Sequence, residues 1–331
     1  MEPVGAFLET CCLARKQTYR NLTVFALLGE QVFEPDYLLL ESALEEGLVE
    51  ICELGPEGSV PELRVLNRAE WPVLIVEGEE LVGAKQNRAV NVTILVAPGA
   101  ELVIPVSCVE QGRWRYRSET FASGAKMMHS SLRRATRESV SFSFRAGDGY
   151  RSDQGRVWNE VAEKAARMNV HSPTMAAAEV FERYESDMDS YLQAFGCMQH
   201  QLGAVFCIHG QVVGLEAFGS PDTFGRFFAK LVKSYALDAI DTGNEAKETK
   251  SAATNQARRF LASAAKAGTE SHRSVGLSET LTFESRIASG VALVHEDRVV
   301  HLSAFRKVGQ RKPGSRVGFQ RYSRRRQRIL V

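Results

Sequence analysis

The chain has 331 residues, of which 44% are hydrophobic and 24% are charged, with a net charge of +1. These values are ordinary for a globular protein, and they exclude a disordered chain, a collagen-like repeat and a disulfide-stapled mini-protein. At roughly 150 residues per domain the length fits two domains or one larger unit, and such a chain buries a large core without metals or disulfides.

The first half of the sequence predicts mostly strands. A short helix is expected within residues 1–20, and a second helix over 36–46 with Gly47 as its stop. Between residues 63 and 117, short apolar runs alternate with turn signals such as Pro98-Gly99, which favours an antiparallel meander, a sandwich or a barrel-like sheet. The expected strands are residues 23–28, 48–54, 73–76, 90–96 and 102–109.

The second half predicts helices around a hairpin. The apolar positions in 174–195 have helical spacing, and core packing explains the aromatic stripe there better than a cofactor site. Ser220-Pro221 is typical of a helix start, and Gly243 of its end. Further helices are expected over residues 153–168 and 244–267, a hairpin over 203–218, and closing strands over 281–305.

This order of elements predicts an α+β fold rather than a doubly wound α/β sheet. We expect a β-rich half over residues 1–150, and a half of helices, hairpin and closing strands over 151–305, the two packed as one unit. The remaining residues, 306–331, form a basic tail that is expected to be flexible.

Charge is distributed unevenly along the chain. Residues 1–305 contain 31 of the 41 basic residues and all 40 acidic residues, a net charge of −9. The basic tail contains no acidic residue, so it either binds the phosphates of RNA or DNA or simply solubilises the chain end. Its ten basic residues are Arg306, Lys307, Arg311, Lys312, Arg316, Arg321, Arg324, Arg325, Arg326 and Arg328.

The cysteines and the ends of the chain indicate a cytoplasmic protein. The six cysteines form no CxxC pair and no zinc-finger spacing, so we expect reduced, mostly buried thiols. The sequence shows no signal peptide and no apolar run long enough for a membrane helix, so no membrane partner is expected.

Two polar clusters interrupt the predicted strands and are the candidate sites. In the first, Lys85 and Arg88 suit phosphate oxygens, and Gln86 and Asn87 suit ribose or base groups. Glu77 or Glu80 suits a general base or a Mg²⁺ ligand. The alternative is a solvated hairpin with cross-strand ion pairs.

The second cluster follows an apolar strand and contains Glu110, Gln111, Arg113 and Trp114. If the strands form a meander, Glu110 and Arg113 face the first cluster, and Trp114 either stacks on a base or closes the barrel. A buried, inert thiol explains neighbouring Cys108 better than a nucleophile. A third polar stretch begins at Asp153, where a helix N-cap with an inward tryptophan is the favoured interpretation.

Several stretches resemble one protein family, the ADP-ribosylglycohydrolase- and rhodanese-phosphatase-associated protein domain. The first two are WPVLIVEGEELVGAKQNR from Trp71 and PVSCVEQGRW from Pro105. Shorter ones are GAVF from Gly203, VGLE from Val213 and LVKSYA from Leu231. The resemblance covers most of residues 10–305 and excludes the basic tail.

The resemblance implies the processing of ADP-ribose-type or related nucleotide metabolites, in the setting of RNA repair or bacterial conflict systems. We therefore expect a nucleotide-type ligand and a hydrolytic site between the two clusters. Lys85, Arg88 and Arg113 would hold phosphate, with Gln111 and Trp114 nearby, and Glu77, Glu80 or Glu110 would act directly or through a divalent metal such as Mg²⁺. The alternatives are a non-enzymatic module that binds nucleic acid or protein through the basic tail, and a scaffold for associated enzymes.

Overall fold

The fold is built mainly from antiparallel strands, with helices packed on them. The computed structural model describes residues 2–30, 34–243 and 250–307, with only the backbone described for 250–253. The helices are α1 (Pro3–Thr10), α2 (Leu40–Glu45), α3 (Ser130–Arg145), α4 (Gln154–Arg167), α5 (Ala177–Arg183), α6 (Glu185–Gln193), α7 (Pro221–Asp241) and α8 (Lys250–Ala265).

The strands fall into three sheets. The eight-stranded sheet has the order β1 (Cys12–Tyr19), β2 (Leu22–Leu28), β12 (Gln201–Ile208), β13 (Gln211–Phe218), β17 (Arg298–Arg306), β16 (Ala288–His295), β15 (Glu279–Glu284) and β14 (Thr269–Arg273). The six-stranded sheet has the order β11 (Phe121–Met127), β7 (Glu79–Gly83), β8 (Arg88–Val90), β10 (Glu101–Cys108), β5 (Glu62–Asn67) and β4 (Val49–Cys52). The third sheet contains β3 (Leu38–Leu39), β6 (Val73–Ile75) and β9 (Ile94–Val96).

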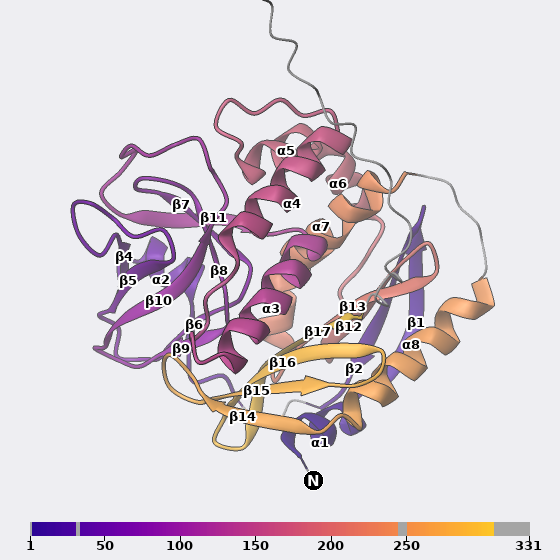
Figure 1. Ribbon diagram of the computed structural model, residues 1–331. Coiled ribbons are helices and arrows are strands. Elements are labelled where there is room, and N and C mark those ends of the chain that lie inside the picture. Colours follow the sequence, from indigo (N-terminus) through magenta and orange to yellow (C-terminus); the bar gives the residue numbers. More distant parts are fainter. Residues whose placement is uncertain (1, 31–33, 244–249, 308–331) are drawn as a thin grey trace, which may run out of the picture.

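Helices cover both faces of the eight-stranded sheet. Because side chains alternate along a strand, Phe206 of β12 packs in a core with α7, whereas Val205 packs in a second core with α1 and α8. Figure 1 shows α8 along the outer side of this sheet and α3 and α7 on the inner side. Burial on both faces explains why β12 is apolar almost throughout.

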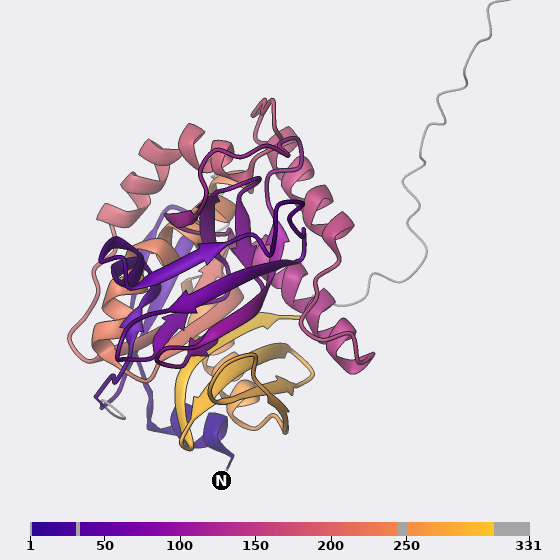
Figure 2. The same ribbon diagram turned by 90° about the vertical axis from the view of Figure 1, so that its left-hand side faces the viewer.

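Helix α7 connects the large sheet to the β-rich half. Ser220 precedes it, Pro221 occupies its first turn, and Gly243 follows it with a φ of +76°, where a glycine is unstrained. Its buried aromatic residues share one core with residues of β6, β11 and α3. Residues of α2 and of strands β4 to β11 form a third core beside this layer, and Figure 2 shows these strands from the side on which they lie in Figure 1.

The structure confirms the predicted α+β class with a β-rich N-terminal half, but several elements differ. The helix expected over 174–195 is confirmed only in part, because the chain breaks at Tyr184 (φ −111°, ψ 19°) and forms the two helices α5 and α6. The expected strand over 90–96 is wrong. Buried polar residues at Asn91 and Thr93 separate β8 from β9, which lie in different sheets.

Helix α3 was not predicted, because its buried face contains arginines. Arg133 and Arg137 are nearly inaccessible to solvent there, so the helix lacks the expected apolar stripe. The helix expected over 36–46 is shorter than predicted, since it begins at Leu40 after the short strand β3.

Other predictions are answered only in part. All six cysteines are free thiols, and Cys11, Cys108 and Cys207 are the buried ones. No helix of the described ranges is long and apolar enough to cross a bilayer. The basic tail beyond Lys307 and the start of the helix expected over 244–267 lie outside the described residues.

Candidate functional site

Pairing of β8 with β10 brings the two predicted clusters together. Cys108 is the register partner of Arg88, so the turn after β10 lies beside the segment that precedes β8. The Gln86 amide donates to the Glu110 carbonyl at 3.0 Å, and the Asn87 backbone N–H donates to the Glu110 carboxylate at 3.1 Å. The expected proximity of these clusters therefore holds for Glu110 and Arg113.

Arg113 is the centre of this buried network. Its Nε donates to Glu110 Oε2 at 2.8 Å, and its other nitrogens donate to Asn87 Oδ1 and to the carbonyls of Gly83 and Ala84. Burial alone would raise the pKa of Glu110. The hydrogen bonds from Arg113 and Asn87 outweigh that effect and lower it. Glu110 is therefore an ionised, fully bonded carboxylate.

The other predicted cations also have partners within the protein. Lys85 Nζ donates to the carbonyls of Pro56 and Glu57 at 2.6 and 2.8 Å, and it lies 5.1 Å from the centroids of two aromatic rings, those of Trp114 and Tyr116. Such contacts hold a loop and its aromatic cover in place.

Arg88 is completely buried beneath this cover. Its Nη1 donates to Gln86 Oε1 at 2.9 Å, and its Nη2 lies 3.7 Å from Glu53 Oε1. Gln111 and Trp114, by contrast, are exposed. A phosphate would reach Arg88 only if the Trp114 segment moved, so Lys85, Arg88 and Arg113 are poorly placed to hold a ligand directly.

Glu77 lies in a different network from Glu110. Gly78 follows it with a φ of +84°, and the Glu77 carboxylate accepts hydrogen bonds from Arg137 and from Ser303 of β17. Arg133 lies 3.5 Å from the same oxygen and also binds Glu216, at 2.8 Å. This network joins the β-rich half to the large sheet through α3.

Glu216 balances the arginine charge on the large sheet. Tyr235 donates a hydrogen bond to it at 2.8 Å, and the ring of His301 lies 3.7 Å away. Burial works against its ionisation, but Arg133 and His301 outweigh burial and lower the pKa of Glu216 to about 2. Burial lowers the pKa of His301, which favours the neutral ring.

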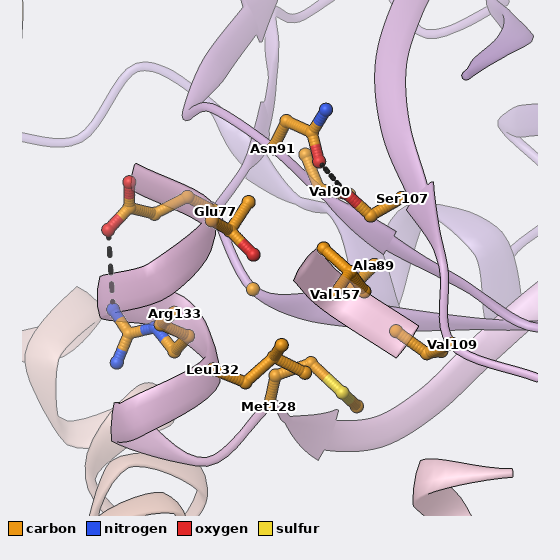
Figure 3. A pocket seen from close by; sticks show the side chains of 12 residues that line it. Glu77, Ala89, Val90, Asn91, Ser107, Val109, Met128, Leu132, Arg133 and Val157 are labelled. Carbon is orange, nitrogen blue, oxygen red and sulfur yellow. Dashed lines mark hydrogen bonds and ion pairs between the residues drawn. The ribbon is translucent and has the colours of Figure 1, made fainter. Parts of the chain in front are cut away.

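A small cavity adjoins Glu77. Figure 3 shows Glu77 and Arg133 on one side of it, the bonded pair Asn91 and Ser107 on another, and apolar side chains including Leu132 along the rest. Its volume is about 10 Å³, enough for roughly one water molecule. The space suits a buried water rather than a nucleotide.

Glu80 lies on the opposite side of β7, and its carboxyl is the least satisfied of the predicted acids. Oε1 accepts a long hydrogen bond of 3.4 Å from the Asn87 amide, and Oε2 has no hydrogen-bond partner among the described residues. Burial raises the pKa of Glu80 to about 7, although Lys126 and Asn87 oppose the shift. This carboxyl is therefore close to half protonated near neutral pH.

A pocket of about 190 Å³ has Gly124 in its lining, and Glu80 lies behind this glycine rather than in the lining itself. The register of β11 shifts between Ser123 and Met127, and Gly124 in this bulge lies directly against the Glu80 side chain. A Cβ on Gly124 would be only 2.6 Å from Glu80 Oε2. The bulge thus separates the carboxyl from the pocket by a residue without a side chain.

Three lysines that were not among the predicted site residues line this pocket, together with Glu182 and Glu185. Lys126 is 3.7 Å from Glu182, and Lys233 is 2.7 Å from Asp189, in pairs whose lysines are half-buried and whose acids are exposed. Lys230 binds Glu41 at 3.0 Å and the buried Glu79 at 3.3 Å. Partly exposed ion pairs of this kind contribute little to stability.

The lysines carried a weak signal in the sequence. Lys230 and Lys233 interrupt the apolar run of α7 three residues apart, which places them on one face of the helix. That signal appears only once the helix is placed against β11. Phe181 and Met188 give the pocket an apolar wall.

Other predicted features have structural roles. Asp153 caps α4, since its side chain accepts a hydrogen bond from the Arg156 backbone N–H at 3.1 Å. Within the residues placed by the structure, no group of three or more histidine, cysteine, aspartate or glutamate side chains has the arrangement of a metal site.

Residues 10–305 match the model of the family described as "ARG and Rhodanese-Phosphatase-superfamily-associated Protein domain". The chain belongs to this family. The family region contains β1 through almost all of β17, and hence both buried networks and the pocket beside Glu80. No curated protein and no solved structure matches the chain significantly.

Proposed function

We propose that this protein binds a nucleotide-type metabolite of the ADP-ribose class in the pocket beside Glu80 and hydrolyses it. One observation carries the proposal. The buried Glu80 carboxyl, with a pKa of about 7, lies directly behind Gly124, and Gly124 lines a pocket together with three lysines and two glutamates. The class of ligand is suggested by the resemblance of the sequence motifs, whereas the family match itself names only an association with ARG and rhodanese-phosphatase proteins.

The lysines suit the phosphate part of such a ligand. Lys126 and Lys233 would exchange their exposed acidic partners for phosphate oxygens, while Lys230 remains anchored by Glu79. The pocket of about 190 Å³ is smaller than the roughly 300 Å³ typical of sites for whole ligands. It therefore suits the ribose-phosphate end, with the rest of the ligand outside.

Glu80 suits the proton transfer that hydrolysis needs. In one turnover the ionised Glu80 carboxylate would take a proton from the water that attacks the scissile bond, and the carboxyl so formed would give that proton to the leaving group as the bond breaks. Glu110 is ionised and fully bonded, so we assign it, with Arg113 and Asn87, to holding Glu80 in position. Glu77 takes no part, because it is bound within the α3 network.

The test is a calorimetric titration of ADP-ribose and ribose 5-phosphate into the full chain. We expect saturable binding that weakens at least roughly tenfold in Lys233→Ala, the loss of one charge-assisted contact. Lys266→Ala, an exposed lysine outside this pocket, is the matched control for charge. Absence of binding in the wild type, or equal weakening in both variants, would reject the pocket as the ligand site.

A further inference from the structure

A groove of about 510 Å³ lies on the other side of the molecule, between α8 and the end of the eight-stranded sheet. Helix α8 contributes Arg259 and Phe260, the turn before β16 contributes Arg286, and β17 contributes Arg306. The proposed metabolite pocket shares no lining residue with it. The groove is large enough to hold a nucleotide unit.

The groove is positively charged. Its three arginines are exposed, and none of its lining residues is acidic. Arg306 donates to the neutral side chain of Gln211 at 2.5 Å. For Arg259 and Arg286, no ion pair with any described residue is present. Exposed guanidinium groups without an acidic partner suit phosphate oxygens, which they bind through two parallel hydrogen bonds.

The positive charge also continues along the chain from the groove. Arg306 is the first residue of the basic tail, and the following residues to 331 add nine basic side chains and no acidic one. A charge distribution longer than the groove matches a linear polyanion better than a single small anion. Gln256 and Ser263 in the groove provide hydrogen-bonding groups for sugars or bases, and Ile287 provides apolar contact.

We propose that this groove binds single-stranded nucleic acid, with the phosphates on Arg259, Arg286 and Arg306. This site is independent of the metabolite pocket, so either proposal can fail without the other.

The experiment measures fluorescence anisotropy of a labelled oligouridylate of about 12 nucleotides with the full chain. The test variant is Arg259→Ser/Arg286→Ser. The control is Arg117→Ser/Arg226→Ser, which removes the same charge from two exposed arginines outside the groove. Circular dichroism and thermal unfolding test whether both variants fold. If the double test variant does not fold, Arg286→Ser alone replaces it.

The wild type should bind with a strong salt dependence. The test variant should bind roughly tenfold more weakly at about 100 mM salt, with a slope against log[salt] smaller by about 1.4, because two phosphate contacts at about 0.7 each are lost. The control should bind as the wild type does.

Three outcomes of the binding measurements would overturn the proposal, and a fourth comes from a competition experiment. The first three are no binding by the wild type, equal affinities for the wild type and the test variant, and equal weakening in the test and control variants. Displacement of the oligonucleotide by polyglutamate at the same charge concentration would also overturn it, since the groove would then accept an acidic protein segment equally well.

Discussion

Glu77 and Glu80 are three residues apart in the sequence, yet their carboxylates belong to separate networks. Glu77 binds Arg137 and Ser303 within the α3 network, whereas Glu80 contacts Asn87 and the bulge at Gly124. The positive φ of Gly78 turns the chain between them. One carboxylate is therefore neutralised by buried arginines, and the other has one oxygen without a partner in the described part of the chain.

The pKa of Glu80 makes stability depend on pH. Because the pKa rises from 4.5 to about 7 on folding, the stabilisation is complete below pH 4.5 and is lost as the pH rises through 7. The full effect is roughly 3 kcal/mol. The free energy of unfolding of Glu80→Gln, measured in urea, should therefore match that of the wild type near pH 5 and exceed it by roughly 2 kcal/mol near pH 8. A constant difference at both pH values would contradict the raised pKa.

Gly124 is expected to tolerate no side chain. In Gly124→Ala the new Cβ would meet not only Glu80 Oε2 but also Glu80 Cβ, at 2.9 Å, so rotation of the carboxyl alone cannot relieve the contact. We expect a loss of about 1–3 kcal/mol in the free energy of unfolding, together with weaker metabolite binding.

Gly225→Ala provides the contrast for that variant. Gly225 lies within α7 with open space around it, so alanine should stabilise the protein by roughly 0.5–1 kcal/mol. Thermal unfolding of both variants measures the comparison. Equal stability of Gly124→Ala and the wild type would show that the bulge is not packed against Glu80.

Arg113 is expected to be essential for the network around Glu110. Arg113→Met removes every partner that this guanidinium provides and leaves the Glu110 carboxylate buried without its counter-ion, which should destabilise the protein by about 3–5 kcal/mol. Arg115→Met, at an exposed neighbouring position, should change stability by less than about 0.5 kcal/mol. Chemical unfolding of both variants tests this prediction. A similarly small change in the free energy of unfolding of both variants would show that Arg113 is not the centre of the network.

Substitution of Glu216 should destabilise the protein as much as substitution of Arg113. Glu216→Gln leaves Arg133 with less negative charge in a fully buried setting, and we expect a loss of about 3–5 kcal/mol near neutral pH. The folded pKa is lowered to about 2, so in the wild type this stabilisation is present above pH 4.5 and lost as the pH falls through 2. The difference between variant and wild type should shrink in acid, and a difference that grows there would contradict the assignment.

The sequence predicted local contacts better than distant ones. Glu110 and Arg113 do approach Asn87 as expected, but not through strands that pair in sequence order, because β8 pairs with β10 while the intervening β9 lies in another sheet. The environment of Glu77 was not predictable in this way, since its partners Arg133 and Arg137 lie on a helix without an apolar stripe. Lys233 was hidden for a related reason, because α7 has the pattern of a core helix and its contact with β11 is purely tertiary.

The most direct test of the central claim is the rate of ADP-ribose hydrolysis by the full chain as a function of pH, in the wild type and in Glu80→Gln. We expect turnover in the wild type with an apparent pKa near 7. We expect Glu80→Gln to bind ADP-ribose normally but to turn it over at least about 100-fold more slowly, as loss of a general acid–base predicts. Equal turnover in both proteins, or none in the wild type, would contradict the assignment of Glu80 as the reacting group.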